Sequence, residues 1–394
     1  MLNEKMLKLG TASSAIRQLF EYGKARKAEI GEDKVFDFSI GNPSVPAPKS
    51  VDETIKKLID DEDSVLLHGY TSAPGDIKVR TKIADYISET SGVQASANNI
   101  YMTCGAAASL TISLTSLANE GDEVILLAPF FPEYRVFAEK AGFKCVVVNC
   151  REPDFQIDIN ALQKAINKKT KAIIINSPNN PTGVVFSEET ILELSSLLNK
   201  KQQEYSKEIF LISDEPYREL VYSNVKVPFP AKFYDNTIVC YSFSKSLSLP
   251  GERIGYIFVS PKCKDSELVF AAVCGAGRAL GFVCAPSMLQ RVVAENLGKT
   301  ADVSIYNTNR ELLYNSLTEY GYTAVKPDGA FYLFVKSPEA DASSFAEKAK
   351  KYELLLVPSD SFGMGGYVRI SYCVSTKQIE KSLPAFKALI KEYQ

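Results

Sequence analysis

The sequence predicts an α/β protein with a large domain, built on a seven-stranded and mostly parallel sheet sandwiched by helices, and a smaller α+β domain. Three observations lead to this class. From about residue 95 to 260, short apolar runs alternate with helical stretches. The runs are rich in valine, isoleucine, leucine and phenylalanine without polar alternation, which is typical of strands buried on both faces. In the C-terminal third the pattern changes to long helices and a hairpin-like segment.

The strands of the large domain are expected at residues 99–103, 123–128, 144–149, 171–176, 208–213, 237–241 and 253–259. Helices are expected between them at residues 106–118, 131–141, 159–167 and 187–204. Repeated alternation of strand and helix favours a parallel sheet covered by helices. Such sheets bind their ligands at the carboxyl ends of the strands.

The smaller domain is expected to combine residues 1–45 with residues 286–394, which leaves residues 46–285 as the large domain. A helical stretch at about 286–320 precedes the hairpin-like segment YTAVKPDGAFYLFVK. A final amphipathic helix carries apolar side chains near helical spacing, although Pro384 interrupts it. The N-terminal segment, with its loop SIGNPSVPAP, has no sheet of its own and is expected to join this domain.

Charge and hydropathy exclude several classes of partner. The 394 residues include 45 basic and 47 acidic side chains, a net charge of −2 that gives no support for a nucleic-acid or anionic-membrane partner. No apolar run approaches the roughly 18 residues that a transmembrane helix needs. The N-terminus lacks the basic start, apolar block and cleavage site of a signal peptide.

The counts of histidine and cysteine exclude other chemistry. His68 is the only histidine, so the sequence predicts no multi-histidine metal site and no Ser-His-Asp triad. The eight cysteines contain no C-x-x-C pair, and most lie inside apolar runs. This pattern predicts buried free thiols in a reducing cytoplasm, and it gives no sign of a metal.

Polar residues follow four of the predicted strands at the point where each strand ends. One strand is followed by small residues that open a helix, and the other three are followed by carboxylate, amide, hydroxyl and amine groups. The residues concerned are Gly105, Ala106 and Ala107 after the first strand, Asn176 and Asn180 after the second, Asp214 and Tyr217 after the third, and Ser242, Ser244, Lys245 and Arg253 after the fourth. The topology brings these groups to one region.

The chemistry of this set points to one cofactor. Small residues at a helix start, together with Ser242, Ser244 and Arg253, suit a phosphate group. Lys245 beside a cation has its charged form disfavoured, and a lysine with a lowered pKa attacks carbonyls to form Schiff bases. Buried Asp214 needs a protonated partner, which a pyridine nitrogen supplies. Phosphate, aldehyde and pyridinium together describe pyridoxal 5′-phosphate (PLP).

With these motifs, the chain resembles the PLP-dependent aminotransferases of class I/II, which have PLP fold type I and include aspartate aminotransferase. The resemblance runs from about residue 22 to the C-terminus. It is carried by SPNNPTG, SDEPY and SFSKSLSLPGERIGY in this order and spacing. It implies a homodimer with active sites shared across the interface, and a ping-pong transfer of an amino group from an L-amino acid to a 2-oxo acid.

The resemblance also implies a role for each cofactor-binding residue. Lys245 is the Schiff-base lysine and proton shuttle, and Asp214 is the partner of the pyridine N–H. Tyr217 and Asn180 hydrogen-bond the phenolic oxygen of the ring, on which Phe131 stacks. The phosphate contacts implied are Gly105, Ala106, Ala107, Ser242, Ser244, Arg253 and Tyr70 of the second subunit. Individually, Asn180 is also a turn residue, and Phe131 is also a candidate for the core.

For the substrate, the resemblance implies that Arg369 binds the α-carboxylate as a bidentate fork and that Gly41 and Asn42 close over it. An aspartate-like donor is favoured. Its distal carboxylate is assigned to Arg278 or Arg17, and Arg278 is equally a candidate for a structural ion pair. Aromatic and neutral donors remain open.

Two other functions remain as alternatives. Related chains on this fold perform β-elimination, decarboxylation or aminocyclopropane-carboxylate synthesis with nearly the same residues, so a PLP-dependent lyase or decarboxylase is the second hypothesis. The third is a non-catalytic PLP-binding regulatory module. That class carries an additional DNA-binding domain, whereas this chain begins almost directly with the aminotransferase-like part and is not basic.

Overall fold

The larger of two structural units is organised around a seven-stranded sheet with the order β2-β8-β7-β6-β5-β3-β4. This computed structural model describes residues 2–11 and 15–394. The strands of the sheet are β2 (Ile100–Thr103), β3 (Glu123–Ala128), β4 (Lys144–Asn149), β5 (Thr170–Asn176), β6 (Phe210–Asp214), β7 (Thr237–Ser242) and β8 (Gly255–Val259). Strand β8 runs antiparallel to both neighbours, and the other pairs are parallel.

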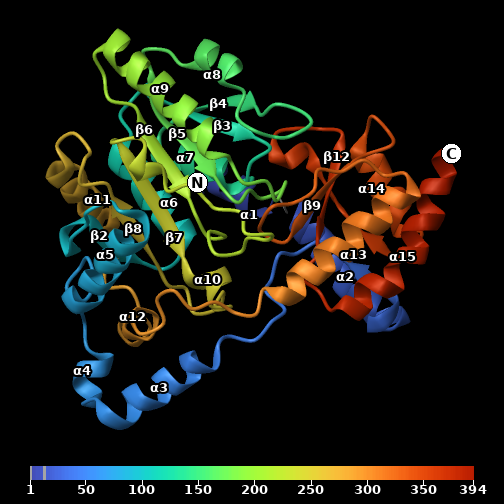
Figure 1. The fold of residues 1–394 in the computed structure, drawn as a ribbon, viewed down its shortest axis with the longest axis horizontal. Coiled ribbons are helices and arrows are strands. Elements are labelled where there is room, and N and C mark those ends of the chain that lie inside the picture. Colours follow the sequence, from blue (N-terminus) through green and yellow to red (C-terminus); the bar gives the residue numbers. More distant parts are fainter. Residues whose placement is uncertain (1, 12–14) are drawn as a thin grey trace.

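Helices cover both faces of this sheet (Figure 1). The helices of this unit are α3 (Lys49–Asp61), α4 (Ser64–His68), α5 (Ile77–Ser91), α6 (Ala106–Leu117), α7 (Glu133–Ala141), α8 (Ile159–Ala165), α9 (Glu188–Tyr205), α10 (Phe243–Ser246), α11 (Ser266–Leu280) and α12 (Ser287–Ala294). Of these, α3 and α4 lie away from the sheet and pack on α12 (Figure 1). The central strands are buried along their whole length, as Ile173 and Leu211, each 0% exposed, illustrate. The predicted fold class is therefore confirmed, because continuous apolar strands need helices on both sides.

The smaller unit lies beside the carboxyl ends of these strands, on the right of Figure 1. It has an antiparallel sheet, β11-β12-β9, and a two-stranded parallel sheet, β1-β10. Its strands are β1 (Phe36–Asp37), β9 (Tyr332–Lys336), β10 (Leu354–Leu355), β11 (Val357–Pro358) and β12 (Tyr367–Ser371). Its helices are α2 (Ala15–Ile30), α13 (Ser304–Tyr320), α14 (Ala342–Lys350) and α15 (Thr376–Ile390), and α1 (Glu4–Thr11) precedes them.

The N-terminal segment joins the small unit through β1, which pairs with β10 more than 300 residues later in the chain. An ion pair of 2.5 Å between Arg26 and Glu353 holds α2 in the same place. In Figure 1 the blue N-terminal chain accordingly lies among the orange and red C-terminal elements. The segment before residue 45 thus contributes to the sheet architecture of this unit.

Two local expectations for the C-terminal third are wrong. The helix expected at 286–320 is divided into α12 and α13, and Gly298, at φ 76°, lies in the break between them. Helix α12 packs on α3 and α5 of the large unit, whereas α13 packs on α15. The hairpin-like segment forms only a single bridge, between Ala324 and Val335, because β9 pairs with the distant β12. A domain boundary after α12 therefore fits the packing better than one before it, and we propose it there.

Side chains at the helix ends explain where several helices begin. Asp76 caps α5 by accepting from the N–H groups of Lys78 and Val79. Ser187 caps α9 by accepting from the N–H of Thr190. Pro384 lies inside α15, which nevertheless continues to its end against α13. Within residues 2–11 and 15–394, none of the helices combines the length and apolar character needed to cross a bilayer.

Candidate active site at the carboxyl ends of the strands

A cavity of about 350 Å³ lies where the carboxyl ends of β5, β6 and β7 face the smaller unit. Strands β5 and β6 stop in register, since Asn176 pairs with Asp214, and β7 continues two residues past Cys240, which pairs with Asp214. The large unit lines the cavity with Ala106, Ala107, Phe131, Asn180, Asp214, Tyr217, Ser242, Ser244, Lys245 and Arg253, and the N-terminal segment and small unit add Ile16, Ile40, Gly41, Tyr332 and Arg369. Most of the residues predicted for the site therefore share one cavity.

Asp214 is a buried carboxylate with only one of its oxygens satisfied. The hydroxyl of Tyr134 donates to its Oδ2 at 2.5 Å. Its Oδ1 is also buried and has no hydrogen-bond partner. Burial raises the pKa of Asp214 to about 7, against the opposing effect of the Tyr134 hydrogen bond. A protonated nitrogen placed at Oδ1 would remove the cost of this unpaired acceptor.

Lys245 lies in α10, one turn beyond the end of β7. Its Nζ donates to the carbonyl of Gly41 at 2.7 Å and lies 5.4 Å from the centre of the Phe331 ring. Burial lowers the pKa of Lys245 to about 8; nearby Cys373 opposes this shift, and Arg253 and Arg369 reinforce it. The amine is therefore closer to its neutral, nucleophilic form than an exposed lysine at pH 7.

A cradle for an anion adjoins this lysine. The first turn of α6 follows Gly105, whose φ of 87° brings the backbone close to Arg253; a Cβ here would lie 2.9 Å from Arg253 Nη2. The hydroxyls of Ser242 and Ser244 are 2.8 Å apart, and Ser244 Oγ accepts from Arg253 Nη1 at 3.5 Å. Helix N–H groups, hydroxyls and a guanidinium in one place suit a phosphate.

Arg369, on β12, closes the opposite end of the cavity and is 2% exposed. Its Nη1 donates to Asn180 Oδ1 at 3.1 Å, and its Nη2 donates to the carbonyl of Ser39 at 2.5 Å. Its buried Nε has no partner. The guanidinium lies 4.7 Å from the centre of the Tyr332 ring. A fixed guanidinium with unused donor capacity is suited to a carboxylate.

Two aromatic residues that the resemblance implicates also line this space. The Tyr217 hydroxyl is 2.9 Å from the Tyr332 hydroxyl, and burial raises the pKa of Tyr217 well above its usual value. Phe131 is half-buried and meets the Tyr134 ring edge-on at 5.7 Å. Phe131 and Tyr217 therefore line the same cavity as Asp214.

Five predicted residues do not line the cavity, and one of them, Gly105, directly precedes the lining residue Ala106. Tyr70 is 98% exposed. Arg278 is exposed on α11, and Asn42 is exposed beside Gly41. Arg17 is exposed on α2, next to Ile16, which does line the cavity.

Sequence reasoning missed Tyr134, Tyr332 and Ile16, and it gave Asn176 no role. Tyr134 follows Phe131 by three residues in the helix expected at 131–141, a spacing that could have indicated it, although in the structure α7 begins only at Glu133. Asn176 donates from Nδ2 to the carbonyl of Asp214 and accepts from the N–H of Asn180, so it ties the two strand ends together. Tyr332 and Ile16 carry no local signal, because they enter the cavity from elements remote in the chain.

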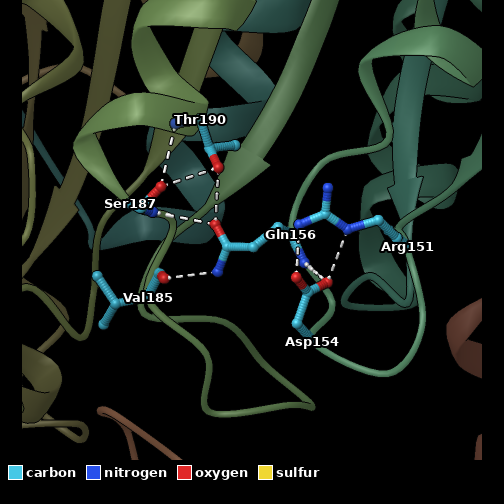
Figure 2. Close-up of polar contacts among 6 residues, drawn as sticks. All are labelled: Arg151, Asp154, Gln156, Val185, Ser187 and Thr190. Carbon is cyan, nitrogen blue, oxygen red and sulfur yellow. Dashed lines mark hydrogen bonds and ion pairs between the residues drawn. The ribbon is translucent and has the colours of Figure 1, made fainter.

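The side chain of Gln156 hydrogen-bonds to the segment that follows the Asn180 loop and leads into α9 (Figure 2). Gln156 Nε2 donates to the carbonyl of Val185 at 3.0 Å. Its Oε1 accepts from the N–H of Ser187 and from the hydroxyl of Thr190. One amide thus joins the end of the loop to the first turn of α9, which restricts the positions open to Asn180.

Comparisons with known proteins agree with this geometry. Residues 33–386 match the family Aminotransferase class I and II, and the chain belongs to that family. It is 31% identical to a probable aspartate aminotransferase of Methanocaldococcus jannaschii over 96% of this chain and 97% of that one. It is 28% identical to aromatic-amino-acid aminotransferase 2 of Thermococcus litoralis over 96% of each chain. The crystal structure of an aminotransferase from Eubacterium rectale superposes with a TM-score of 0.98 at 55% identity, covering 100% of this chain and 99% of that one.

The protein is therefore an aminotransferase of PLP fold type I, which moves an amino group between an amino acid and a 2-oxo acid with PLP as cofactor. The residues present fit that cofactor. The unpaired Oδ1 of Asp214 matches a protonated ring nitrogen, and the cradle around Gly105 and Arg253 matches a phosphate. The Lys245 amine lies on the same cavity, where it can meet an aldehyde.

We expect Asp214→Asn to change how the stability of the cofactor-free protein depends on pH. Because the pKa of Asp214 is raised from 3.8 to about 7, the folded state holds a proton that the unfolded state has released between these values. Stability therefore falls as pH rises through this window, by about 4 kcal/mol if the full shift is realised. Asparagine removes this contribution, so the variant should unfold at a higher urea concentration than wild type at pH 8 and at a similar one at pH 4.

The matched control is Asp60→Asn, which changes an exposed carboxylate on α3 and should keep the wild-type dependence. Urea unfolding of all three cofactor-free proteins between pH 4 and 8 measures the effect. Identical pH dependence in wild type and Asp214→Asn would contradict the unpaired state of this carboxylate.

Proposed function

We propose that Lys245, Asp214, Tyr217, Asn180 and Arg369 carry the transamination in this cavity. The observation that supports this most directly is that one cavity is lined by a buried amine of lowered pKa, a carboxylate with an unpaired oxygen and a guanidinium with an unpaired Nε. The three groups match the aldehyde and ring nitrogen of the cofactor and the α-carboxylate of the substrate.

Each residue has a distinct part in the proposed mechanism. When bound, PLP supplies an electron sink for the charge that develops at the substrate Cα. Arg369 holds the α-carboxylate and so orients the Cα–H bond toward Lys245. Neutral Lys245 Nζ would accept the proton from the substrate Cα. It would then deliver that proton to the cofactor carbon that keeps the amino group. Asp214 keeps the ring nitrogen protonated, and Tyr217 with Asn180 hydrogen-bonds the phenolic oxygen.

The same residues serve both halves of a ping-pong reaction. The first half releases a 2-oxo acid, and the second accepts another 2-oxo acid at the same Arg369. The contact between Lys245 and the carbonyl of Gly41 shows how closely the N-terminal segment covers this space. That cover limits access of bulk water to the reacting carbon.

We expect Lys245→Ala to abolish the visible absorbance of the lysine-bound cofactor and to lower kcat by a factor of about 10³–10⁴, since both the nucleophile and the proton carrier are lost. Absorbance spectra and steady-state rates measure the two effects. Lys262→Ala is the control, because Lys262 is exposed beyond β8 and distant from the cavity lining. Multiple turnovers at the wild-type rate in Lys245→Ala would exclude the assignment.

For the donor, we propose an aspartate-like L-amino acid. The chain is similar over nearly its whole length to a probable aspartate aminotransferase. The cations of the cavity lining are Lys245, Arg253 and Arg369, and each is assigned above. The distal carboxylate therefore needs a further cation, and we propose Arg17 on α2 or Arg278 of a second subunit for this contact.

An apolar donor is the second candidate. Ile16, Ile40, Leu110 and Phe131 form an apolar part of the cavity wall. The similarity to an aromatic-amino-acid aminotransferase points the same way. A phenylalanine side chain would pack there without any distal cation.

Measurements of kcat/KM for L-aspartate and for L-phenylalanine distinguish the aspartate-like donor from the apolar one. We expect aspartate to be at least tenfold better, and we expect Arg278→Ala or Arg17→Ala to lower the aspartate-to-phenylalanine ratio by about tenfold or more, as the loss of a charged hydrogen bond requires. A wild-type preference for phenylalanine would establish the apolar donor. An unchanged ratio in both variants would remove both arginines from substrate recognition.

We also propose that the protein is a homodimer whose active sites are shared. Tyr70 lies beside exposed apolar side chains on α4, of which Val65 is 79% and Leu66 64% exposed. The segment after α11 reaches the same place, where Cys284 Sγ donates to the carbonyl of Thr71 at 3.3 Å. A contiguous exposed apolar surface of this kind is typical of an interface, and a second copy would cover it.

Mixed dimers test whether Tyr70 acts on the partner's site. Tyr70→Phe alone should weaken PLP binding by about tenfold, because a hydrogen bond to the phosphate is lost. A dimer of one Tyr70→Phe subunit and one Lys245→Ala subunit has one site with both native residues if Tyr70 crosses the interface. We expect that dimer to bind one equivalent of PLP with wild-type affinity. Weak binding at its lysine-containing site would show that Tyr70 acts within its own chain.

We propose a cytoplasmic location as well. All eight cysteines are free thiols, and four of them are buried. Free buried thiols are usual in compartments that keep cysteine reduced.

A further inference from the structure

A second cavity, of about 510 Å³, lies between α5, the start of α9 and the loop that follows β6. It is separate from the catalytic cavity, with which it shares no lining residue. Tyr256, which lines the second cavity, stacks on Tyr241 at 4.9 Å, and both pack in the cluster that contains α5. The alternate residues Cys240 and Ile257 belong to the core on the other face of the sheet. The second cavity therefore opens from the α5 face.

The inner wall of this cavity contains charged side chains that the catalytic assignment does not use. Glu215 is 1% exposed and forms an ion pair with Arg218 at 2.5 Å. Arg218 also donates to the carbonyls of Val227 and Pro228, each at 3.1 Å. All three nitrogens of its guanidinium are thereby committed to Glu215 and to the backbone. This pair is neutral as a unit.

Glu219 adds a second carboxylate to this wall without a cation of its own. Its Oε2 is buried and receives no hydrogen bond from any described residue. Burial raises the pKa of Glu219 to about 6, opposed by a contact with the Tyr241 hydroxyl and by the charge of Arg218. At pH 7.5 the carboxylate is ionised, so the buried wall carries one uncompensated negative charge. An unpaired buried charge is costly, and a cation that binds there would relieve the cost.

Aromatic rings and a charged rim complete the cavity. Tyr86, Phe229 and Tyr256 contribute ring surfaces to the lining, and ring faces attract cations as well as flat apolar groups. At the mouth, Lys226 and Lys232 are exposed, together with Glu188. The rim thus carries two cations and one carboxylate, whereas the unpaired carboxylate of Glu219 belongs to the inner wall.

We propose that this cavity is a second ligand site, which takes a small organic cation with a guanidinium or ammonium head against Glu219 and a flat body against Phe229 and Tyr256. The cationic head supplies the hydrogen-bond donors that Glu219 Oε2 lacks. This proposal does not depend on which substrate binds in the catalytic cavity.

Benzylguanidine is the probe that tests this site in the PLP-loaded enzyme. It has no carboxylate for Arg369 to bind and no primary amine to condense with the cofactor. Calorimetric titration at pH 7.5 should show one site per chain. Glu219→Gln should weaken the affinity at least tenfold, because the neutral amide cannot pair with the cation. Glu188→Gln makes the same change at the exposed rim and should alter the affinity less than threefold.

No binding to wild type at millimolar probe, or equal affinity in Glu219→Gln, would overturn the proposal. Crystals of the wild-type PLP-loaded enzyme soaked in benzylguanidine provide a test that needs no variant. Probe density between Glu219 and Phe229 is expected, and density in the catalytic cavity alone would contradict the site.

Discussion

The active site depends on one buried carboxylate that the protein satisfies on one side only. Asp214 ends β6 at the centre of the sheet, where the residue is only 5% exposed. Tyr134 bonds to one oxygen, and the other is left without a donor. A buried acceptor without a partner costs about 1–3 kcal/mol, more when it is charged. The fold therefore holds in advance a place for a protonated ring nitrogen, which links binding of the cofactor to stability.

Burial also shifts the pKa of Lys245, which lines the same cavity, but in the opposite direction. It raises the pKa of Asp214 and lowers that of Lys245, so the values draw together to about 7 and about 8. In each case the low-dielectric surroundings penalise the charged form. Asp214 thus lacks a cation that would stabilise its ionised form, which a protonated ring nitrogen would supply, and Lys245 more readily presents the neutral amine that attacks an aldehyde.

Substrate recognition is built at the junction of the two units. Arg369 comes from the small unit but is fixed by Asn180 of the large unit and by the carbonyl of Ser39 in the N-terminal segment. Lys245 in turn bonds to the carbonyl of Gly41 from that segment. A shift of the small unit would move the guanidinium and uncover the amine together. Orientation of the substrate and exclusion of water are therefore coupled in this fold.

The sequence by itself determined the fold class, the strand ends and the chemistry gathered there. Continuous apolar runs followed by Asn180, Asp214 and Lys245 are local patterns, and a parallel sheet necessarily brings its carboxyl ends to one edge. The tertiary structure decided which remote side chains meet them. Tyr332 reaches the cavity because β9 pairs with β12, and the break before α13 arises where α12 packs on the large unit. Contacts between distant elements depend on how two surfaces pack, and no periodicity within one segment records that.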